Sequence, residues 1–467
     1  MQFILDVVGA VNTFLWDYAL LILLCGTGVF FTFRLRFVQI RKLGSGFRRL
    51  FGGLSLRGQK ADEQGMSSFQ ALATAIAAQV GTGNITGAAL AIASGGPGAI
   101  FWMWVSAFFG MATIYAEAVL AQKFRSTVDG HVTGGPIYYI RAAFRGRFGR
   151  LLSGFFSIAI ILALGFMGNM VQSNSIGAAM ETAFHIPPMA AGIAVAAAAG
   201  FIFVGGVRRI ASVTEKVVPV MALLYIGGCL VILAINHTAL PACFRQIFVT
   251  AFSPQSIAGG VVGVTVQKAM RFGVARGLFS NEAGMGSTPH AHAIAKVKRP
   301  QEQGVIAMTG VFIDTFIILT LTALVILSSG ALQADGVNSA TMAQYAFSKA
   351  FGSFGNIFIA VCMLFFAFST IVGWYFFGEI NVKALFGRKA VRLYAAAVVL
   401  FVAAGSALKV DLVWSLSDMF NGLMVIPNLI SLLALSGLVA RMSREDDILS
   451  STAGEETPQD GESPAAD

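Results

Sequence analysis

Long apolar runs separated by short polar stretches recur along the whole chain. Each run holds roughly 20 residues or more, which is enough to cross about 30 Å of hydrocarbon as an α-helix. The runs do not alternate apolar and polar residues as the strands of a membrane β-barrel do. The pattern therefore predicts an all-α, polytopic membrane protein. Eleven spanning segments are predicted, at about residues 14–34, 68–94, 99–122, 152–180, 189–206, 216–236, 258–296, 304–330, 342–380, 391–408 and 411–439.

Basic residues gather in every second connection between these segments. Cytoplasmic connections are enriched in Lys and Arg, so this alternation predicts an N-terminus outside and a C-terminus in the cytoplasm. The basic stretches are 34–60, 123–150, 208–216, 296–299, 383–392 and 441–444. Four cations fit the alternation less well, and we expect them at the outer ends of their segments or in a wet vestibule: Lys268, Arg271, Arg276 and Lys349.

Composition supports a membrane protein and excludes some other classes. Of 467 residues, 56% are hydrophobic and 12% charged, against a charged share of about 25% in soluble domains. The net charge of +9 falls in the connections, so it indicates topology and not nucleic-acid binding. The cysteines have no metal-ligand spacing, and neither a metal site nor a disulfide framework is expected. Because Asp6 and Asp17 lie at the head of the first apolar run, a cleaved signal peptide is not expected either.

The segments divide into one leading helix and two sets of five. We expect an N-terminal helix with a basic loop over residues 1–66, a first repeat over 67–257 and a second over 258–440. The remaining stretch, 441–467, is acidic and rich in Ser and Pro after its first residues, which predicts a disordered cytoplasmic tail.

Two segments carry glycines and polar residues in their middle, in "GTGNITG" (81–87) and "RGLFSNEAGMGSTPHAHA" (276–293). A phosphate-cradling loop would need a preceding strand, which the pattern does not offer. Close helix packing through small residues is a second interpretation. The third is an interrupted helix, which membranes tolerate where the backbone is buried in protein or lines a cavity. Interrupted helices lead both halves of inverted-repeat transporters, and these segments lead the two sets of five in opposite sense. We therefore predict two broken helices that face each other.

Such a pair of breaks offers opposite partial charges. Free N–H groups at Thr82, Gly83 and Asn84, at the positive end of a half-helix, suit a carboxylate. Carbonyls freed near Phe279 and Ser280 suit an ammonium or a metal cation. Together they describe a zwitterion, that is, an amino acid. Hard oxygen ligands suit an alkali cation and not zinc or copper.

The same glycine-rich segments, with "GGPGAIFWMWVSAFFG" (95–110), resemble the alanine or glycine:cation symporters, the sodium:alanine symporter family. The resemblance spreads over most of the chain. It implies a fold similar to the leucine transporter, with five helices and an inverted five behind one extra helix. It also implies sodium-coupled uptake of a small neutral amino acid, with proton coupling as an occasional variant.

The resemblance places substrate contacts on four core helices. Thr82 and Gly83 would hold the carboxylate, and Asn84 would ligate a sodium ion beside it. Phe279 would close the pocket, and Ser280 would offer a polar contact. On the third and eighth core helices the implied contacts are Phe166, Gln172, Thr370 and Trp374. Interhelical amide bonds would explain Gln172 and its polar neighbours equally well.

A second sodium site is implied between the first and eighth core helices. Its five oxygens would be the carbonyls of Ala77, Val80 and Phe366 and the hydroxyls of Ser369 and Thr370. The alternative is that both hydroxyls only bond carbonyls one turn earlier, a common habit in membrane helices.

Several ionisable residues lie within the segments. A carboxylate such as Asp314 costs about 2.5–3.5 kcal/mol at the centre of a spanning helix, so it should face the protein interior. It is either a charge close to sodium or the partner of a buried cation. The role of Glu282 is open, and its protonation or that of Asp314 would matter if protons drive transport. Glu117 should cap an internal gate or pair with a loop arginine. His290 and His292 lack a carboxylate at ligand spacing, which favours a gate or structural role over a metal site.

The sequence thus predicts a secondary-active symporter of the bacterial inner membrane that imports alanine or glycine with sodium by alternating access. Glutamine, with sodium or proton coupling, is the main alternative. No nucleophile–base or metal constellation predicts an enzyme, and no organic cofactor or nucleic-acid partner is expected. The oligomeric state is not predicted.

Overall fold

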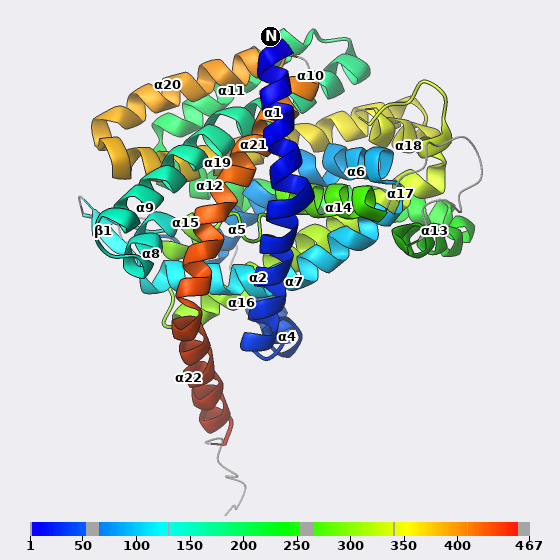
Figure 1. The fold of residues 1–467 in the computed structure, drawn as a ribbon. Coiled ribbons are helices and arrows are strands. Elements are labelled where there is room, and N and C mark those ends of the chain that lie inside the picture. Colours follow the sequence, from blue (N-terminus) through cyan, green and yellow to red (C-terminus); the bar gives the residue numbers. More distant parts are fainter. Residues whose placement is uncertain are drawn as a thin grey trace, which may run out of the picture.

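The structure is a computed structural model that describes residues 2–52, 65–128, 130–252, 266–339, 341–408 and 410–455. One long helix begins the chain and runs along the outside of the bundle, against α7 and α21 (Figure 1). At its end Arg36 and Phe37 take left-handed φ angles of 53° and 56°, which turn the chain into two short helices. The elements of this part are α1 (Gln2–Phe14), η1 (Leu15–Ala19), α2 (Leu20–Arg34), α3 (Val38–Arg41) and α4 (Leu43–Gly52).

The first set of core helices follows, with a small antiparallel hairpin after its second span. Its helices are α5 (Ser68–Gln79), η2 (Gly83–Gly87), α6 (Ala88–Gly95), α7 (Gly98–Lys123), α8 (Pro136–Ala143), α9 (Gly146–Ile160), η3 (Ile161–Gly168), α10 (Asn169–Phe184), α11 (Pro188–Val204), α12 (Gly206–Ile235), η4 (His237–Ala239) and α13 (Leu240–Phe252). The hairpin strands are β1 (Ser126–Val128) and β2 (His131–Thr133).

The second set of core helices completes the bundle. Its helices are α14 (Val266–Asn281), α15 (Pro289–Ala293), α16 (Pro300–Val311), η6 (Phe312–Leu319), α17 (Thr320–Ser329), η7 (Ala331–Gln333), α18 (Met342–Phe351), α19 (Ser353–Phe386), α20 (Arg388–Gly405), α21 (Val410–Ala434) and α22 (Ser436–Glu455). Among these elements η1, η2, η3 and η6 are π-helical, and they widen the turns of the helices they continue.

The described residues contain seven helices long and apolar enough to cross a membrane, or eight if the bent pair α5 and η2–α6 counts as one span. This confirms a polytopic α-helical membrane protein. The exact count of eleven spans, the repeat boundaries and the orientation of the termini stay predictions. Part of the predicted segment 258–296 lies outside the described residues.

Both predicted breaks are present. α5 begins at a capping box formed by Ser67 and Gln70 and ends at Gln79, and the chain resumes at Gly83 with a bend of 47°. α14 ends at Asn281, and positive φ angles at Glu282 (58°), Gly284 (93°) and Gly286 (79°) carry the chain to α15.

The two broken helices run in opposite directions. α14 packs against η2 and α6, whereas α15 packs against α5, so the first half of each helix faces the second half of the other. The prediction that residues 79–86 and 279–286 are interrupted and close to each other is confirmed.

Three predicted boundaries are wrong. The segment 342–380 is two helices, because Gly352 (φ 61°) turns the chain between α18 and α19. The predicted loop 237–257 contains α13. The tail is helical through Glu455 instead of disordered from 441, because Val439, Ala440 and Met442 on α22 are buried. Residues 456–467 lie outside the described chain.

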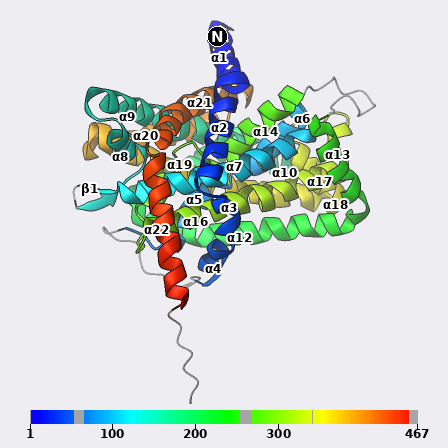
Figure 2. The same ribbon diagram turned by 60° about the horizontal axis from the view of Figure 1, so that its bottom comes forward.

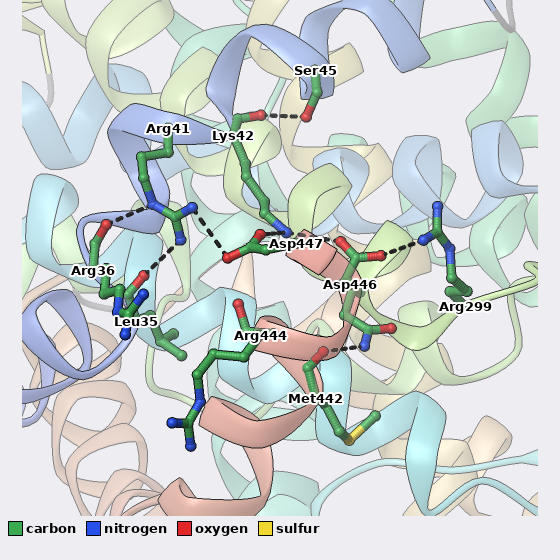
Figure 3. Close-up of polar contacts among 12 residues, drawn as sticks. Leu35, Arg36, Arg41, Lys42, Ser45, Arg299, Met442, Arg444, Asp446 and Asp447 are labelled. Atoms are coloured by element: carbon green, nitrogen blue, oxygen red, sulfur yellow. Dashed lines mark hydrogen bonds and ion pairs between the residues drawn. The ribbon is translucent and has the colours of Figure 1, made fainter. Parts of the chain in front are cut away.

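α22 and α4 project from the same end of the bundle in two views (Figures 1 and 2). Figure 3 shows the ion pairs that hold α22 there. Lys42 contacts Asp446 at 2.8 Å and Asp447 at 2.6 Å, and Arg299 contacts Asp446 at 2.8 Å. Partial burial acts to raise the pKa of Asp447, but the hydrogen bond and charge of Lys42 and the charge of Arg41 outweigh it and lower that pKa. The contribution of Asp447 is therefore present at neutral pH and is lost as the pH falls through its lowered pKa.

Replacing both carboxylates, Asp446→Asn with Asp447→Asn, is expected to loosen α22. Asp446 is 8% exposed and Asp447 is partly exposed, so the ion pairs should contribute about 1 kcal/mol, the upper end of the range for surface pairs. Trypsin should therefore cleave after Arg441 and Arg444 about fivefold faster, and high salt should reduce the difference in cleavage rate between the double variant and the wild type. The cleavage rates are measured by limited proteolysis followed by gel electrophoresis. The matched control is Glu445→Gln, at an exposed position of the same helix. Equal cleavage rates for the double variant and the wild type would show that the ion pairs do not hold α22.

Candidate functional site

The first break presents backbone N–H groups to the protein interior. The N–H of Gly81 donates to Asn84 Oδ1 at 3.1 Å, and the N–H of Thr82 donates to Gln172 Oε1 at 3.1 Å. Thr82, Asn84 and Gln172 are fully buried. The N–H of Asn84, which was predicted to be free, donates to Gly81 O at 3.3 Å. The break thus places backbone donors inside the bundle, where a helix start can bind an anion.

Glycines let the two breaks touch. A Cβ placed on Gly83 would lie 3.0 Å from Ser280 Cα and 3.3 Å from Phe279 Cδ1, so a side chain here would push the breaks apart. A Cβ on Gly81 would collide with Thr370 Oγ1 of α19. The structure thus brings together the predicted positions Thr82, Gly83, Phe279, Ser280 and Thr370 from three helices.

Asp314 joins the two breaks. Asn84 Nδ2 donates to its Oδ1 at 2.7 Å, and Ser280 Oγ lies 3.0 Å from each carboxylate oxygen. The hydroxyl of Thr315 donates to Oδ2 at 2.9 Å. These partners are all neutral, and Asp314 is fully buried. A buried carboxylate surrounded by neutral donors suits a bound cation. Asp314 was predicted to be either a charge close to sodium or the partner of a buried cationic side chain. Its neutral partners favour the first role.

The five oxygens of the second predicted sodium site are also gathered. Thr370 Oγ1 lies 2.8 Å from Ala77 O, 3.5 Å from Val80 O and 3.0 Å from Phe366 O. Ser369 Oγ lies 3.5 Å from Ala77 O and 2.9 Å from Phe366 O. The bonds to Phe366 are the local ones that the alternative interpretation predicts. The bonds to Ala77 and Val80 reach the break of another helix, which local bonding does not explain.

An aromatic wall closes the site beside the second break. The ring of Phe279 meets that of Trp374 edge-on at 5.5 Å between centroids, and it packs on Trp414 at 4.8 Å. The indole N–H of Trp374 donates to Glu282, whose other oxygen accepts from the hydroxyl of Ser287. Glu282 therefore fixes the indole, a role that the sequence left open.

Phe166 does not lie at the breaks. Its ring packs on Tyr394 and Phe401 of α20, at 5.7 and 4.7 Å between centroids. The π-helical turns of η3 rotate the helix so that Gly168 faces Trp374; a Cβ there would lie 2.5 Å from Trp374 Cζ3. The predicted contact at Phe166 is corrected by this rotation.

The neighbours of Gln172 make the interhelical bonds that the alternative interpretation predicted. Ser173 Oγ donates to Val402 O at 2.6 Å, and Asn174 Nδ2 donates to Gly405 O at 2.9 Å. Gln172 itself turns to the first break. Interhelical bonding therefore describes Ser173 and Asn174, whereas Gln172 lies at the site.

Two roles were predicted for Glu117, capping an internal gate and pairing with a loop arginine, and the structure contradicts the second. It accepts the backbone N–H groups of Gly284 at 3.1 Å and Gly286 at 2.9 Å and the amide of Asn428, so it pairs with the second break and not with a loop arginine. Asn428 also donates to Gly284 O at 2.9 Å. Reasoning from sequence missed Asn428, and its only signal was an amide after Pro427 in an apolar helix.

The histidines make structural contacts. His290 Nδ1 lies 2.7 Å from Ser287 O, and its Nε2 lies 2.8 Å from Asn381 Nδ2. His292 Nδ1 lies 2.8 Å from Gln303 Oε1. Within the described ranges no group of three or more His, Cys, Asp or Glu residues could hold a metal ion.

Arg276, one turn before Phe279, is 4% exposed and forms an ion pair with Asp418 of α21. Its guanidinium also lies 4.8 Å from the centroid of the Trp414 ring. This pair ties the second broken helix to α21 and corrects the expectation that Arg276 lies in a wet vestibule.

Asp418→Asn is expected to destabilise the fold by about 3 kcal/mol, because it leaves a buried guanidinium without a counter-charge. The unfolding temperature of the detergent-solubilised protein measures the loss. The double variant Arg276→Met with Asp418→Leu is the control, since replacing both charges by apolar groups should recover most of the stability. An unchanged unfolding temperature for the single variant would contradict the pairing.

Comparisons with known proteins show the family and the fold of this chain. The profile of the sodium:alanine symporter family matches residues 1–456. The sodium/alanine symporter AgcS of Methanococcus maripaludis is 42% identical over 443 residues, which cover 94% of this chain and 96% of that protein. The probable sodium/glutamine symporter GlnT of Bacillus subtilis is 41% identical, with 94% and 90% covered.

A solved structure shows the same fold at low sequence identity. MhsT in complex with L-phenylalanine aligns with a TM-score of 0.57 over 83% of this chain and 99% of that chain, at 13% identity. The leucine-transporter-like fold that the family resemblance implied is thereby confirmed. The chain is a multi-pass membrane protein, its relatives are transporters, and sodium is the co-transported ion. It belongs to the sodium:alanine symporter family, whose members carry out sodium-coupled amino-acid symport.

Proposed function

We propose that this protein imports alanine or glycine together with sodium across the bacterial inner membrane, with its N-terminus outside and its C-terminus in the cytoplasm. The observation that carries the proposal is the meeting of two broken helices at Asp314, through Asn84 on one side and Ser280 on the other. In this proposal, the N–H groups of the first break and the carbonyls expected near Phe279 and Ser280 at the second are the two halves of an amino-acid site.

The residues at the breaks have distinct roles in this proposal. The N–H groups of Thr82 and Gly83 hold the substrate carboxylate. Asn84 Oδ1, which also accepts the N–H of Gly81, and the Asp314 carboxylate hold one sodium ion beside it, and the negative charge of Asp314 balances the positive charge of the ion. Because the carboxylate and the ion share neighbouring ligands, each binds more tightly when the other is present, which couples the two.

A second sodium ion binds the oxygens of Ala77, Val80, Phe366, Ser369 and Thr370. These groups belong to α5, the turn that follows it and α19, so the ion draws the first broken helix onto a helix outside the broken pair. A ligand shifts a conformational equilibrium by its differential affinity for the two states. Sodium therefore favours the state in which these helices are in contact and the substrate site is formed.

Uptake by the purified protein in proteoliposomes tests the function. An inward sodium gradient should concentrate labelled alanine or glycine inside, and removing sodium should abolish accumulation. Failure to concentrate either amino acid would overturn the assignment of substrate. A channel would equilibrate the amino acid without accumulating it.

Glutamine is the second candidate substrate, and the similarity to GlnT favours it. Competition by a panel of unlabelled amino acids, with and without sodium, separates it from alanine and glycine. Repeating the panel with a proton gradient in place of the sodium gradient tests the choice of coupling ion.

Trp374→Leu is expected to widen the pocket, because Trp374 is 1% exposed and its ring contacts Phe279. Uptake of larger neutral amino acids relative to alanine should rise about tenfold, the size of effect that one or two methylene groups of pocket space produce. The ratio of kcat/KM values measures this. An unchanged ratio would show that Trp374 does not limit the size of the substrate.

A further inference from the structure

A side chain of the protein itself lies on the first break. Gln172 Oε1 accepts the N–H of Thr82 at 3.1 Å, the same N–H that the proposed function gives to the substrate carboxylate. The position of a Cβ on Gly81 would be 3.1 Å from the same oxygen, so the carboxamide lies directly against the broken backbone. A carboxamide oxygen accepts hydrogen bonds through two lone pairs, as each carboxylate oxygen does.

The nitrogen of the same carboxamide makes no hydrogen bond within the described residues. Gln172 is 0% exposed, and its Nε2 has no hydrogen-bond partner among the residues that the structure describes. The buried hydroxyl of Thr82 is also without a partner there. Buried polar groups are nearly always paired, so an unpaired amide calls for an explanation beyond packing.

The second break shows the reciprocal arrangement. Gln79 Nε2 donates to Asn281 O, at the end of α14, at 2.8 Å. Its Oε1 is buried and has no partner in the described part of the chain. One glutamine thus supplies an acceptor to the first break and another supplies a donor to the second, while the breaks approach to the distance set by Gly83 and Ser280.

We propose that Gln172 stands in for the substrate carboxylate when the carrier closes without substrate. The inference rests on the proposed function, in which the N–H of Thr82 holds that carboxylate. Substrate displaces the carboxamide oxygen, and the freed Nε2 becomes available as a donor. In the closed state without substrate, Gln172 Oε1 accepts the N–H of Thr82, so this buried N–H keeps a hydrogen-bond partner.

This role affects one half of the transport cycle. Net uptake requires the carrier to return without substrate, whereas exchange of internal for external substrate does not. Without Gln172, the closed substrate-free form would bury the N–H of Thr82 unpaired, which is costly. The substrate-free return step should therefore slow, and exchange should persist.

The test compares both modes for the Gln172→Met variant in proteoliposomes, using the amino acid that the wild type concentrates. Net sodium-driven uptake is expected to fall about tenfold, the effect of one unpaired buried group. Counterflow, measured with equal sodium on both sides and unlabelled substrate inside, should fall less than net uptake does, because it omits the substrate-free return. The ratio of net uptake to counterflow should therefore drop by at least about threefold. Gln172→Glu keeps an oxygen acceptor, so its ratio of net uptake to counterflow should stay near that of the wild type.

Two further variants complete the design. Gln39→Met replaces a buried glutamine that bonds Thr32 far from the breaks, and it should leave the ratio unchanged. If Gln172→Met does not fold, Gln172→Asn takes its place. Its side chain is one methylene shorter, so net uptake should again fall more than counterflow. Equal losses of net uptake and counterflow in Gln172→Met or Gln172→Asn, or no loss in either mode for both of these variants, would overturn the inference. If the wild type neither concentrates nor exchanges any amino acid, the proposed function fails first.

Discussion

Asp314→Asn is expected to lower sodium-driven amino-acid uptake about 100-fold, which corresponds to about 2.7 kcal/mol. The substitution keeps the shape of the side chain but removes the negative charge between the two breaks. It also turns one acceptor oxygen into an N–H donor that faces the donors of Asn84 and Ser280. Leaving buried donors opposed costs about 1–3 kcal/mol, and the lost attraction for sodium adds to this.

Sodium titration separates this effect from a loss of fold. The variant should require much more sodium for half-maximal uptake, while its elution profile and helix content match those of the wild type. Asp335→Asn, in the exposed loop before α18, is the matched control and should transport normally. Wild-type sodium affinity in the Asp314 variant would remove this residue from the proposed ion site.

The sequence predicted the breaks because membrane depth makes irregular backbone conspicuous. Glycines and polar residues in "GTGNITG" and "SNEAG" interrupt otherwise apolar segments, and only a buried or cavity-lining backbone accepts such an interruption. The antiparallel placement of the two breaks followed from the alternation of basic loops. Asp314 was recognised for the same reason, since a carboxylate in an apolar helix has few permitted positions.

Features set by helix rotation and distant pairing could not be predicted. Phe166 and Gly168 are two residues apart, and the π-helical turns of η3 decide which of them faces Trp374. Glu117 and Asn428 are 311 residues apart, and periodicity does not reveal that they share one backbone partner. The helix α22 was missed because its stability comes from tertiary contacts: the burial of Val439, Ala440 and Met442 and the ion pairs with Lys42 and Arg299.

The double variant Ser369→Ala with Thr370→Val is expected to raise the sodium concentration for half-maximal uptake about 30- to 100-fold, or about 2–2.7 kcal/mol. It removes two of five oxygens from a site in which hydroxyls of α19 meet the carbonyls of Ala77 and Val80. Hard cations depend on the number of oxygen ligands, so losing two should weaken binding far more than it changes packing. The KM for the amino acid at saturating sodium then tests whether Thr370 also contacts the substrate, as the resemblance implies. A KM within about threefold of the wild-type value would assign its hydroxyl to sodium alone.

A matched control decides between ligation and local hydrogen bonding. Thr309 lies on α16, is 1% exposed and donates to Val305 O one turn earlier at 2.9 Å, the local bond that Thr370 also makes to Phe366. If local bonding were the whole role of the hydroxyls, Thr309→Val and the double variant would alter stability alike and leave sodium affinity unchanged. If the hydroxyls ligate sodium, only the double variant shifts the sodium dependence. The bond from Thr370 to Ala77, at 2.8 Å, is shorter than its bond to Phe366, at 3.0 Å, and it crosses between helices that sodium would draw together. That geometry is why we expect the sodium dependence of the double variant, and not that of Thr309→Val, to move.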